Sequence, residues 1–286
     1  MSVKVDAFFH MGTSTISYVV SDPKTARAAI IDSVLDYDPR SGRTSTESAD
    51  AISGHIESNG LTIEWILDTH PHADHITAAQ VMKDRYGAPV AIGADVVKVQ
   101  ETFREIYNLG SDFRADGSQF DRLLDDGDRI GIGELTLEAF ATPGHTPACM
   151  TYAVDDAAFV GDAVFMPDYG SARTDFPGGD AAILYDSIMR IYALPPETRI
   201  FVCHDYAPNG RGYAWETTVA EERESNIHLR ADTGKEAFVK LRKTRDVALS
   251  LPELIVAALQ VNIRAGRFPE PESNGVAYLK VPINGF

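Results

Sequence analysis

Four side chains that can bind a metal fall within six residues, directly after the apolar run 61–67. They are His70, His72, Asp74 and His75, in the spacing H-x-H-x-D-H. A protein core cannot absorb such a group, since each buried polar group needs a partner and each buried charge needs a counter-charge. A cation meets both needs, and histidine and carboxylate are ligands of zinc, iron and manganese. The cluster therefore predicts a metal site at the end of a strand.

Three further candidate ligands follow at wide spacing, each at the end of an apolar, strand-like run: His145, Asp162 and His204. Five of the eight histidines fall in these motifs, which is more than scatter along the chain would give. Loops at strand ends often carry functional residues, because the strand fixes the loop and the loop reaches the cleft. We therefore expect all of these side chains to meet at one metal-binding cleft.

The overall composition favours a globular protein that acts on a small molecule. With 286 residues, of which 44% are hydrophobic, the chain can bury a sizeable core. Its formal net charge of -16 argues against nucleic acid as a partner, because no basic field would attract phosphates. The first residues lack a signal-peptide pattern, and no run approaches about 18 apolar residues, so neither export nor membrane insertion is indicated. We expect a cytoplasmic protein.

Several isolated residues with reactive side chains have simpler interpretations. Cys149 and Cys203 are flanked by apolar residues, which is typical of small buried thiols in a reducing compartment. Neither has a paired base in its sequence context that would make it a nucleophile. His10, His55 and His228 each stand alone, and we expect solvated or packing roles for them.

Strand-like and helical patterns alternate through the first three quarters of the chain. Strands are expected at residues 5–9, 15–20, 28–33, 61–68, 129–132, 135–141, 150–154, 157–160 and 199–203. Helices are expected at residues 46–58, 74–86, 94–106 and 180–192. Asp74 is well placed to be the N-cap of the second of these helices. A polar loop is expected at residues 37–43.

From residue 215 onward the pattern becomes mainly helical, and a last strand-like run follows at 276–281. No repeat, low-complexity tract or linker divides the chain, so we expect a single domain over residues 1–286. Its core would be residues 1–214, and the mainly helical segment 215–286 would cover one side of the metal cleft. Strand groups flanked by helices, with ligands at several strand ends, indicate an α/β sandwich of two packed sheets covered by helices.

The motifs in this order resemble those of the metallo-β-lactamase superfamily, and the resemblance spans nearly the whole chain. It implies a four-layer αββα sandwich with a helical C-terminal segment. Two branches of that superfamily compete, glyoxalase II and the persulfide dioxygenases. The string Arg173-Thr174-Asp175-Phe176 is similar to the Arg-Thr-Asp-Phe of the dioxygenases, whereas glyoxalase II tends to have a Gly-Arg-Phe-Phe-Glu-like string. The helical tail also looks like that of the dioxygenases.

The dioxygenase resemblance implies one ferrous iron per chain, held by His70, His145 and Asp162 with coordination positions left open. The implied reaction oxidises glutathione persulfide, or a similar low-molecular-weight persulfide, with O2 to sulfite and thiol. The remaining candidate ligands would surround the iron as outer hydrogen-bonding groups. These are His72, Asp74, His75 and His204.

The glyoxalase II resemblance implies a different use of the same residues. In such a hydrolase the four outer groups complete a site for two zinc ions or mixed metals, with Asp162 as the bridge. A metal-bound hydroxide would then attack a glutathione thioester or a lactone. The ligand residues alone do not separate the two reactions. A metal-bearing fold kept for binding or sensing is a third, non-enzymatic interpretation.

Arg173 and Tyr206 are the candidates for catalysis and substrate binding beside the metal. Arg173 would give an anionic tripeptide local positive charge, with an ion pair to Asp175 as the structural alternative. Tyr206 would offer a phenol to the substrate or to bound oxygen. Asp205 is at least as well explained as a buried carboxylate that caps backbone amides. The segments 37–44 and 162–173 look distinctive and are expected to shape the pocket mouth, and a homodimer is compatible with the sequence.

Overall fold

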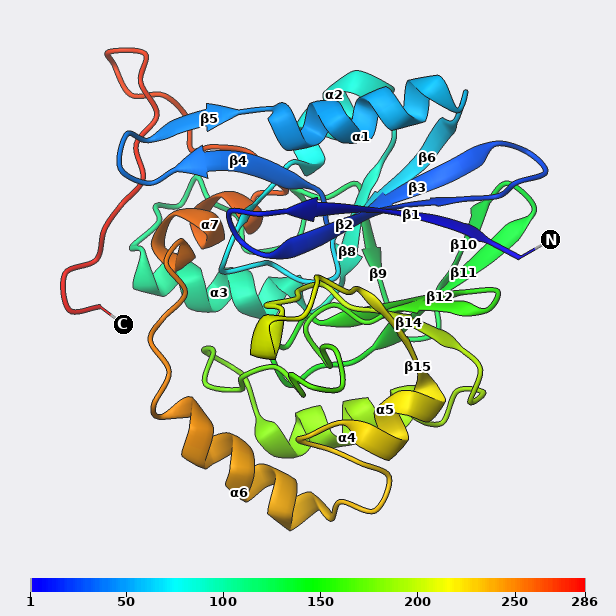
Figure 1. The fold of residues 1–286 in the computed structure, drawn as a ribbon. Coiled ribbons are helices and arrows are strands. Elements are labelled where there is room, and N and C mark those ends of the chain that lie inside the picture. The colour runs from blue at the N-terminus through cyan, green and yellow to red at the C-terminus, as the bar shows by residue number, and fades with distance from the viewer. Residues whose placement is uncertain (1, 286) are drawn as a thin grey trace.

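Two packed β-sheets form the centre of the molecule (Figure 1), and the computed structural model describes residues 2–285. The first sheet has the strand order β1-β2-β3-β6-β8-β9. Its members are β1 (Lys4–His10), β2 (Thr15–Ser21), β3 (Arg27–Ile31), β6 (Thr62–Leu67), β8 (Val90–Gly93) and β9 (Arg122–Leu124). The pairs from β1 to β3 are antiparallel and those from β3 to β9 are parallel.

The second sheet has the strand order β10-β11-β12-β13-β14-β15 and is antiparallel except between β13 and β14. Its members are β10 (Arg129–Ile132), β11 (Leu135–Ala141), β12 (Met150–Val154), β13 (Ala157–Phe159), β14 (Arg199–Phe201) and β15 (Glu216–Thr218). A small third sheet has the order β5-β4-β7. It consists of β4 (Val34–Asp38), β5 (Arg43–Ser45) and β7 (Ile76–Thr77).

Helices cover the outer faces of both large sheets, which confirms the four-layer αββα sandwich (Figure 1). α1 and α2 lie above the first sheet, and α4, α5 and α6 lie below the second. α7 packs on β7, and α6 packs on α4. The bounds are α1 (Glu47–Ser58), α2 (Ala79–Tyr86), α3 (Val96–Ile106), α4 (Ala181–Ile191), α5 (Val219–Ser225), α6 (Lys235–Asp246) and α7 (Ile255–Asn262).

Helix α4 shows how the sequence sets an element's start and orientation. Asp180 caps it, since its carboxylate accepts hydrogen bonds from the backbone N–H groups of Ala182 and Ile183 at 2.7 and 2.9 Å. Such a cap typically contributes about 1 kcal/mol. Leu184 and Ile188, four residues apart on one face, are fully buried in the core between the layers. The predicted helix at residues 180–192 is therefore confirmed.

The core between the sheets is built around three aromatic side chains, Tyr18, Phe159 and Phe201. The Phe159 and Phe201 rings stack at 5.0 Å, and Tyr18 meets both edge-on at 5.1 and 5.5 Å. Fully burying a side chain of this size contributes about 1.5–3 kcal/mol. Since the three residues lie on β2, β13 and β14, this packing fixes the strands that lead into the histidine and aspartate loops.

Asp74 is not a helix N-cap, contrary to the prediction, because the residues after it are held in extended conformation. β7 (Ile76–Thr77) pairs with β4, and the side chain of Asn262 on α7 bridges the loop. Its amide nitrogen donates to the carbonyls of His72 and His75 at 2.7 and 2.8 Å, and its oxygen accepts from the Thr77 N–H at 2.9 Å. Helix α2 therefore begins only at Ala79.

Three other expectations about secondary structure were wrong in part. The segment 37–43, expected to be a polar loop, forms the turn of the β4–β5 hairpin together with the strand residues that flank it. The Asp38 carboxylate stabilises this turn, because it accepts hydrogen bonds from the Arg40 N–H and the Ser41 hydroxyl. Six short strands were not predicted, namely β4, β5, β7, β8, β9 and β15, and β15 lies at the start of the segment expected to be helical. In the described chain, residues 276–281 form no strand, and Lys280 instead pairs through its backbone with the Gln260 side chain.

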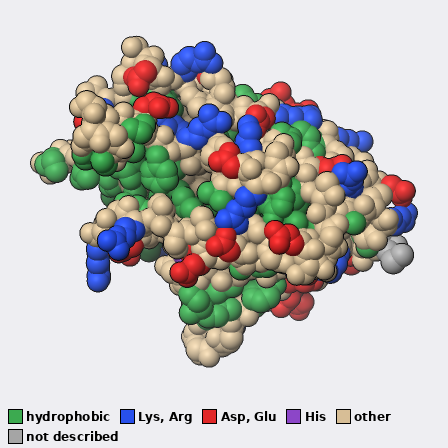
Figure 2. Space-filling model, turned by 90° about the horizontal axis from the view of Figure 1, so that it is seen from above, with side chains coloured by type: hydrophobic (Ala, Val, Ile, Leu, Met, Phe, Trp, Pro, Cys, Tyr) green, Lys and Arg blue, Asp and Glu red, His purple; other side chains and the backbone are tan. Residues whose placement is uncertain are grey.

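Charged side chains are mixed on the face shown in Figure 2, where neither sign gathers into a large region. Among residues 2–285, none of the helices combines the length and apolar character that crossing a bilayer requires.

Candidate metal centre and its cavity

The strand ends bring the predicted ligands together. The histidine loop follows β6, His145 follows β11, Asp162 follows β13 and His204 follows β14. Glycines precede two of these residues where the backbone passes close to a neighbour. A side chain at Gly144 (φ 133°) would lie 2.4 Å from the Leu184 backbone, and one at Gly161 (φ 51°) would lie 2.7 Å from the Thr69 hydroxyl. Only glycine fits there without strain.

The seven candidates form two adjacent groups, and within each group the ligand atoms all lie within 4.8 Å of one another. One group is His70, His145 and Asp162, and the other is His72, Asp74, His75 and His204. Asp162 lies between them: its carboxylate oxygens are 3.7 Å from His145 Nε2 and 3.4 Å from His204 Nε2. The expectation that these residues meet in one place is confirmed.

In three of the histidines one ring nitrogen forms a hydrogen bond within the protein, which leaves the other ring nitrogen free to face a metal. Thr69 donates its hydroxyl proton to Asp32, so its oxygen accepts from His70 Nδ1 at 3.0 Å. His72 Nε2 donates to Asp32 at 3.0 Å, and His145 Nδ1 donates to the Arg173 carbonyl at 2.9 Å. These bonds fix the tautomers, because a carbonyl or carboxylate can only accept.

The atoms left over converge without partners among the described residues. His70 Nε2, His72 Nδ1, His75 Nε2 and one oxygen of Asp162 are buried and make no hydrogen bond. Buried polar atoms are normally paired, and so many exceptions at one place need an explanation. A bound cation supplies it, and the donor set of imidazoles and carboxylates suits iron or zinc. The residues present therefore fit a metal.

Burial and neighbouring charges shift the pKa values of three histidines in this cluster. Burial lowers the pKa of His70 and of His72 well below the ordinary histidine value, so both rings are neutral ligands. Burial also opposes the charged form of His204, but Asp74 and Asp162 raise its pKa above the ordinary value. The two carboxylates thus create a negative field at the centre of the site, which a cation would neutralise.

Asp32 was missed by the sequence analysis although it supports the site directly. It follows β3, is 2% exposed, and accepts from the Thr69 N–H at 2.7 Å as well as from the Thr69 hydroxyl and His72. Its backbone is left-handed, with φ 51°, a strained conformation that often marks functional residues. A carboxylate directly after the buried run Ala28 to Ile31 was the available signal.

A cavity of about 1010 Å³ opens onto the metal-ligand groups, and Asp74, His145 and Asp162 line it. The β4–β5 hairpin and the segment 162–173 contribute to its wall, as expected, together with residues of α6 and the segment that follows it. The aromatic part of the wall consists of Phe165, Tyr169 and Tyr206. The Tyr169 and Tyr206 rings lie 4.7 Å apart, and the Phe165 ring meets each edge-on.

Arg173 and Tyr206 both line the cavity, but their contacts differ. The Arg173 guanidinium pairs with Asp175 at 2.6 and 2.7 Å and donates to the Ser250 carbonyl at 2.6 Å. Tyr206 is 43% exposed, and no hydrogen bond of its hydroxyl is found in the described part of the chain. Arg173 therefore forms the ion pair with Asp175 that was its structural alternative, whereas the Tyr206 hydroxyl is free to contact a ligand.

Asp205 holds the neighbouring loop, as its sequence context indicated. Its buried carboxylate accepts from the Ala214 N–H at 2.8 Å and pairs with Arg211 at 2.6 and 2.7 Å. Arg211 also pairs with Asp168 at 2.6 and 2.9 Å, so it joins the loop after β14 to the loop that carries Tyr169. The salt bridges therefore fix two parts of the aromatic wall relative to each other.

The isolated histidines and cysteines are mainly packed as expected. His55 lies edge-on to Phe8 at 5.4 Å. His10 and the buried His228 line the cavity, which the sequence analysis did not predict. Both cysteines are buried and free, and burial raises the pKa of the Cys149 thiol to about 12 and also that of Cys203. Such protonated thiols are not nucleophiles at neutral pH.

The fold and the buried histidine and aspartate groups define a metal-binding enzyme built on a layered αββα sandwich. The chain belongs to the metallo-beta-lactamase superfamily, whose family model matches residues 13–204. That match ends at the last candidate ligand, His204, and so spans both ligand groups.

Relatives of two kinds cover almost the whole chain. A probable metallo-hydrolase of Burkholderia pseudomallei is 52% identical over 290 residues, which cover 98% of this chain and 99% of that protein. The human mitochondrial persulfide dioxygenase ETHE1 is 32% identical over 261 residues, which cover 90% of this chain and 87% of that protein. The crystal structure of ETHE1 from Myxococcus xanthus is similar with a TM-score of 0.74 and 30% identity, and the match covers 92% of this chain and 100% of that one.

Proposed function

We propose that the protein is an iron-dependent persulfide dioxygenase with one ferrous iron per chain, held by His70, His145 and Asp162. The observation that carries this proposal is the position of the group at the cavity. His145 and Asp162 line the cavity, so a substrate can reach the metal position. Two histidines and one carboxylate leave coordination positions open for substrate and O2. The similarity to human persulfide dioxygenase supports the same reaction.

Bound iron would supply the accessible redox change that oxygen chemistry requires and that zinc lacks. Side chains and backbone groups of the protein would hold the metal ligands and the substrate in position. Asp32 and the Arg173 carbonyl hold two histidines in position, and His204 and Asp74 surround the metal position with hydrogen-bonding groups. The free phenol of Tyr206 is placed to donate to a bound substrate.

Glutathione persulfide, or a similar small persulfide, is the proposed substrate, with sulfite and thiol as products. The cavity of about 1010 Å³ is at the upper end of the range for small-molecule sites, so a tripeptide fits it. The same proposal includes a cytoplasmic location, no nucleic-acid partner and a homodimer as a compatible assembly.

The purified protein is expected to contain about one iron per chain and to consume O2 when given glutathione persulfide, with sulfite as product. Metal analysis, an oxygen electrode and sulfite detection measure these quantities on one preparation. If an iron-free, zinc-loaded preparation is the active form, the proposal fails.

A binuclear hydrolase acting on a glutathione thioester or a lactone is the second candidate. It is favoured by the complete group His72, Asp74, His75 and His204 beside the first, with Asp162 between the two. The Burkholderia relative named as a probable metallo-hydrolase points the same way. Two metals per chain together with hydrolysis of S-lactoylglutathione in the absence of oxygen would establish this activity instead.

Arg173→Ala should raise the persulfide concentration needed for half-maximal rate while the iron content stays unchanged. The reason is loss of a guanidinium that lines the cavity and can pair with an anionic substrate. Asp175→Asn is the matched control, because it removes the charge of the Arg173 partner and leaves the guanidinium in place. Loss of soluble protein in Arg173→Ala, with normal kinetics in the control, would assign Arg173 a structural role only.

A further inference from the structure

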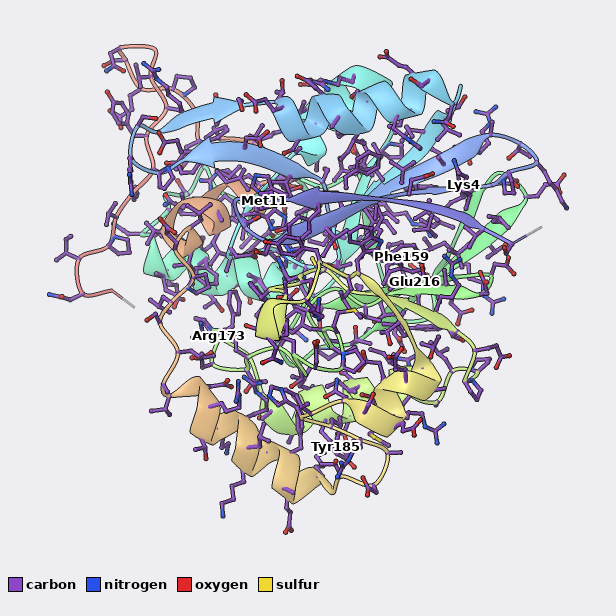
Figure 3. The ribbon with its side chains drawn as sticks, viewed as in Figure 1. Lys4, Met11, Phe159, Arg173, Tyr185 and Glu216 are labelled. Atoms are coloured by element: carbon purple, nitrogen blue, oxygen red, sulfur yellow. The ribbon has the colours of Figure 1, made fainter. Side chains whose placement is uncertain are left out.

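One peptide group, between Arg173 and Thr174, is bound on both sides by side chains of the protein. Its carbonyl accepts from His145 Nδ1 at 2.9 Å. Its N–H donates to the carboxylate of Asp246 at 2.9 Å, and the Thr174 hydroxyl donates to the same oxygen at 2.9 Å. Asp246 is the last residue of α6, and Figure 3 shows Arg173 beside that end of the helix.

The carboxylate in this chain of contacts is buried and has a buried counter-ion. Asp246 is 4% exposed, Thr174 is 8% exposed, and Arg242, which forms an ion pair with Asp246, is 2% exposed. The Arg242 guanidinium also donates to the Ser171 carbonyl at 3.0 Å. The segment 171–174 is therefore hydrogen-bonded to α6 at two points, and the same segment carries the carbonyl that orients His145.

The position of Asp246 is unfavourable for the helix itself. A negative side chain at a helix C-terminus opposes the helix dipole, and an acid that follows a base at i,i+4 is the weaker of the two orders. A buried ion pair is also no gain over apolar residues of similar volume. A carboxylate kept at this place is better explained by what it does for the peptide in front of it.

We propose that Asp246 is a positioning residue for the metal ligand His145 and acts through the Arg173–Thr174 peptide. Histidine ligands usually donate their second N–H to a carboxylate or a carbonyl, which orients the ring and raises its basicity. Here a carboxylate and a carbonyl act in series. The negative charge on the N–H side polarises the peptide and strengthens its carbonyl as an acceptor for His145. The inference rests on His145 binding a metal, as in the proposed function, and holds for either reaction.

The test is the metal affinity of the Asp246→Asn variant, measured anaerobically on metal-free protein by competition with a chromophoric chelator, once with ferrous iron and once with zinc. Asparagine keeps the shape and can still accept from the Thr174 N–H, but it removes the charge. We expect affinity about 10- to 100-fold weaker, the range typical of groups that orient a metal ligand. In cobalt-substituted protein, the visible absorption bands should shift as well.

Glu222→Gln is the matched control. Glu222 is a fully buried carboxyl group that also lies in the C-terminal helical part, and it accepts from the Asn226 amide at 2.6 Å. Burial raises its pKa to about 8, so glutamine mimics the form present at neutral pH. This variant should bind metal as the wild type does. An equal loss in both variants would mean general loosening and would overturn the proposal.

Asp246→Asn leaves Arg242 buried without its counter-ion, so the double variant R242Q/D246N provides a version with no buried charge. It should fold and show the same loss of metal affinity. Wild-type affinity in either folded variant would refute the role of Asp246. If wild-type protein instead hydrolyses a thioester and consumes no O2, the proposed reaction fails while this inference stands.

Discussion

Asp162→Ala is expected to purify essentially free of metal. Its carboxylate lies 3.7 Å from His145 Nε2 and 3.4 Å from His204 Nε2, so it belongs to the first ligand group and borders the second. Without it a mononuclear site keeps two histidines and no carboxylate to balance the charge of the cation. His70→Ala and His145→Ala should have the same result. Elemental analysis of protein produced with added iron measures the stoichiometry.

His204→Ala is the control that separates a ligand from an outer hydrogen-bonding group. In the proposed mononuclear enzyme it should still purify with iron, and its turnover should fall by roughly 10- to 100-fold, as is typical for such groups. If the wild type holds two metals and His204→Ala holds one, the mononuclear assignment is wrong and His204 binds a second metal.

The part of the site that could be predicted from sequence is the part that lies on strand ends. His145, Asp162 and His204 each follow an apolar run, and such runs become central strands whose ends meet at one edge of the sandwich. The short strands β8, β9 and β15 escaped prediction, because three or four residues carry too little periodicity to be recognised without the neighbouring strand.

The residues that hold the ligands in place could not be found in the same way. Asn262 bonds to the backbone of residues 185 to 190 positions earlier, and Asp246 bonds to Thr174 across 72 positions. No local pattern encodes such contacts, which depend on how α6 and α7 pack. The same long-range contacts explain the error at Asp74, since local preference favoured a helix cap and the Asn262 bridge held the chain extended.

The largest loss of stability is expected from Arg242→Gln. The Arg242–Asp246 pair has side chains only 2% and 5% exposed, so removing the cation leaves a buried carboxylate without a counter-charge. Breaking a buried pair in this way typically costs about 3–5 kcal/mol. Denaturant unfolding of metal-free protein measures the change. Lys98→Gln, which breaks the exposed pair with Asp95, should leave the midpoint almost unchanged.

The pH dependence of this loss tests its electrostatic origin. With Arg242 gone, the folded state holds a buried carboxylate without a counter-charge, and protonation removes that unpaired charge. The deficit relative to wild type should therefore shrink as the pH falls towards the acid range and grow as the pH rises. The double variant R242Q/D246N should show no such trend. A midpoint for Arg242→Gln equal to that of the wild type at neutral pH would mean that Asp246 carries no charge there, and the positioning role of its carboxylate would fall with it.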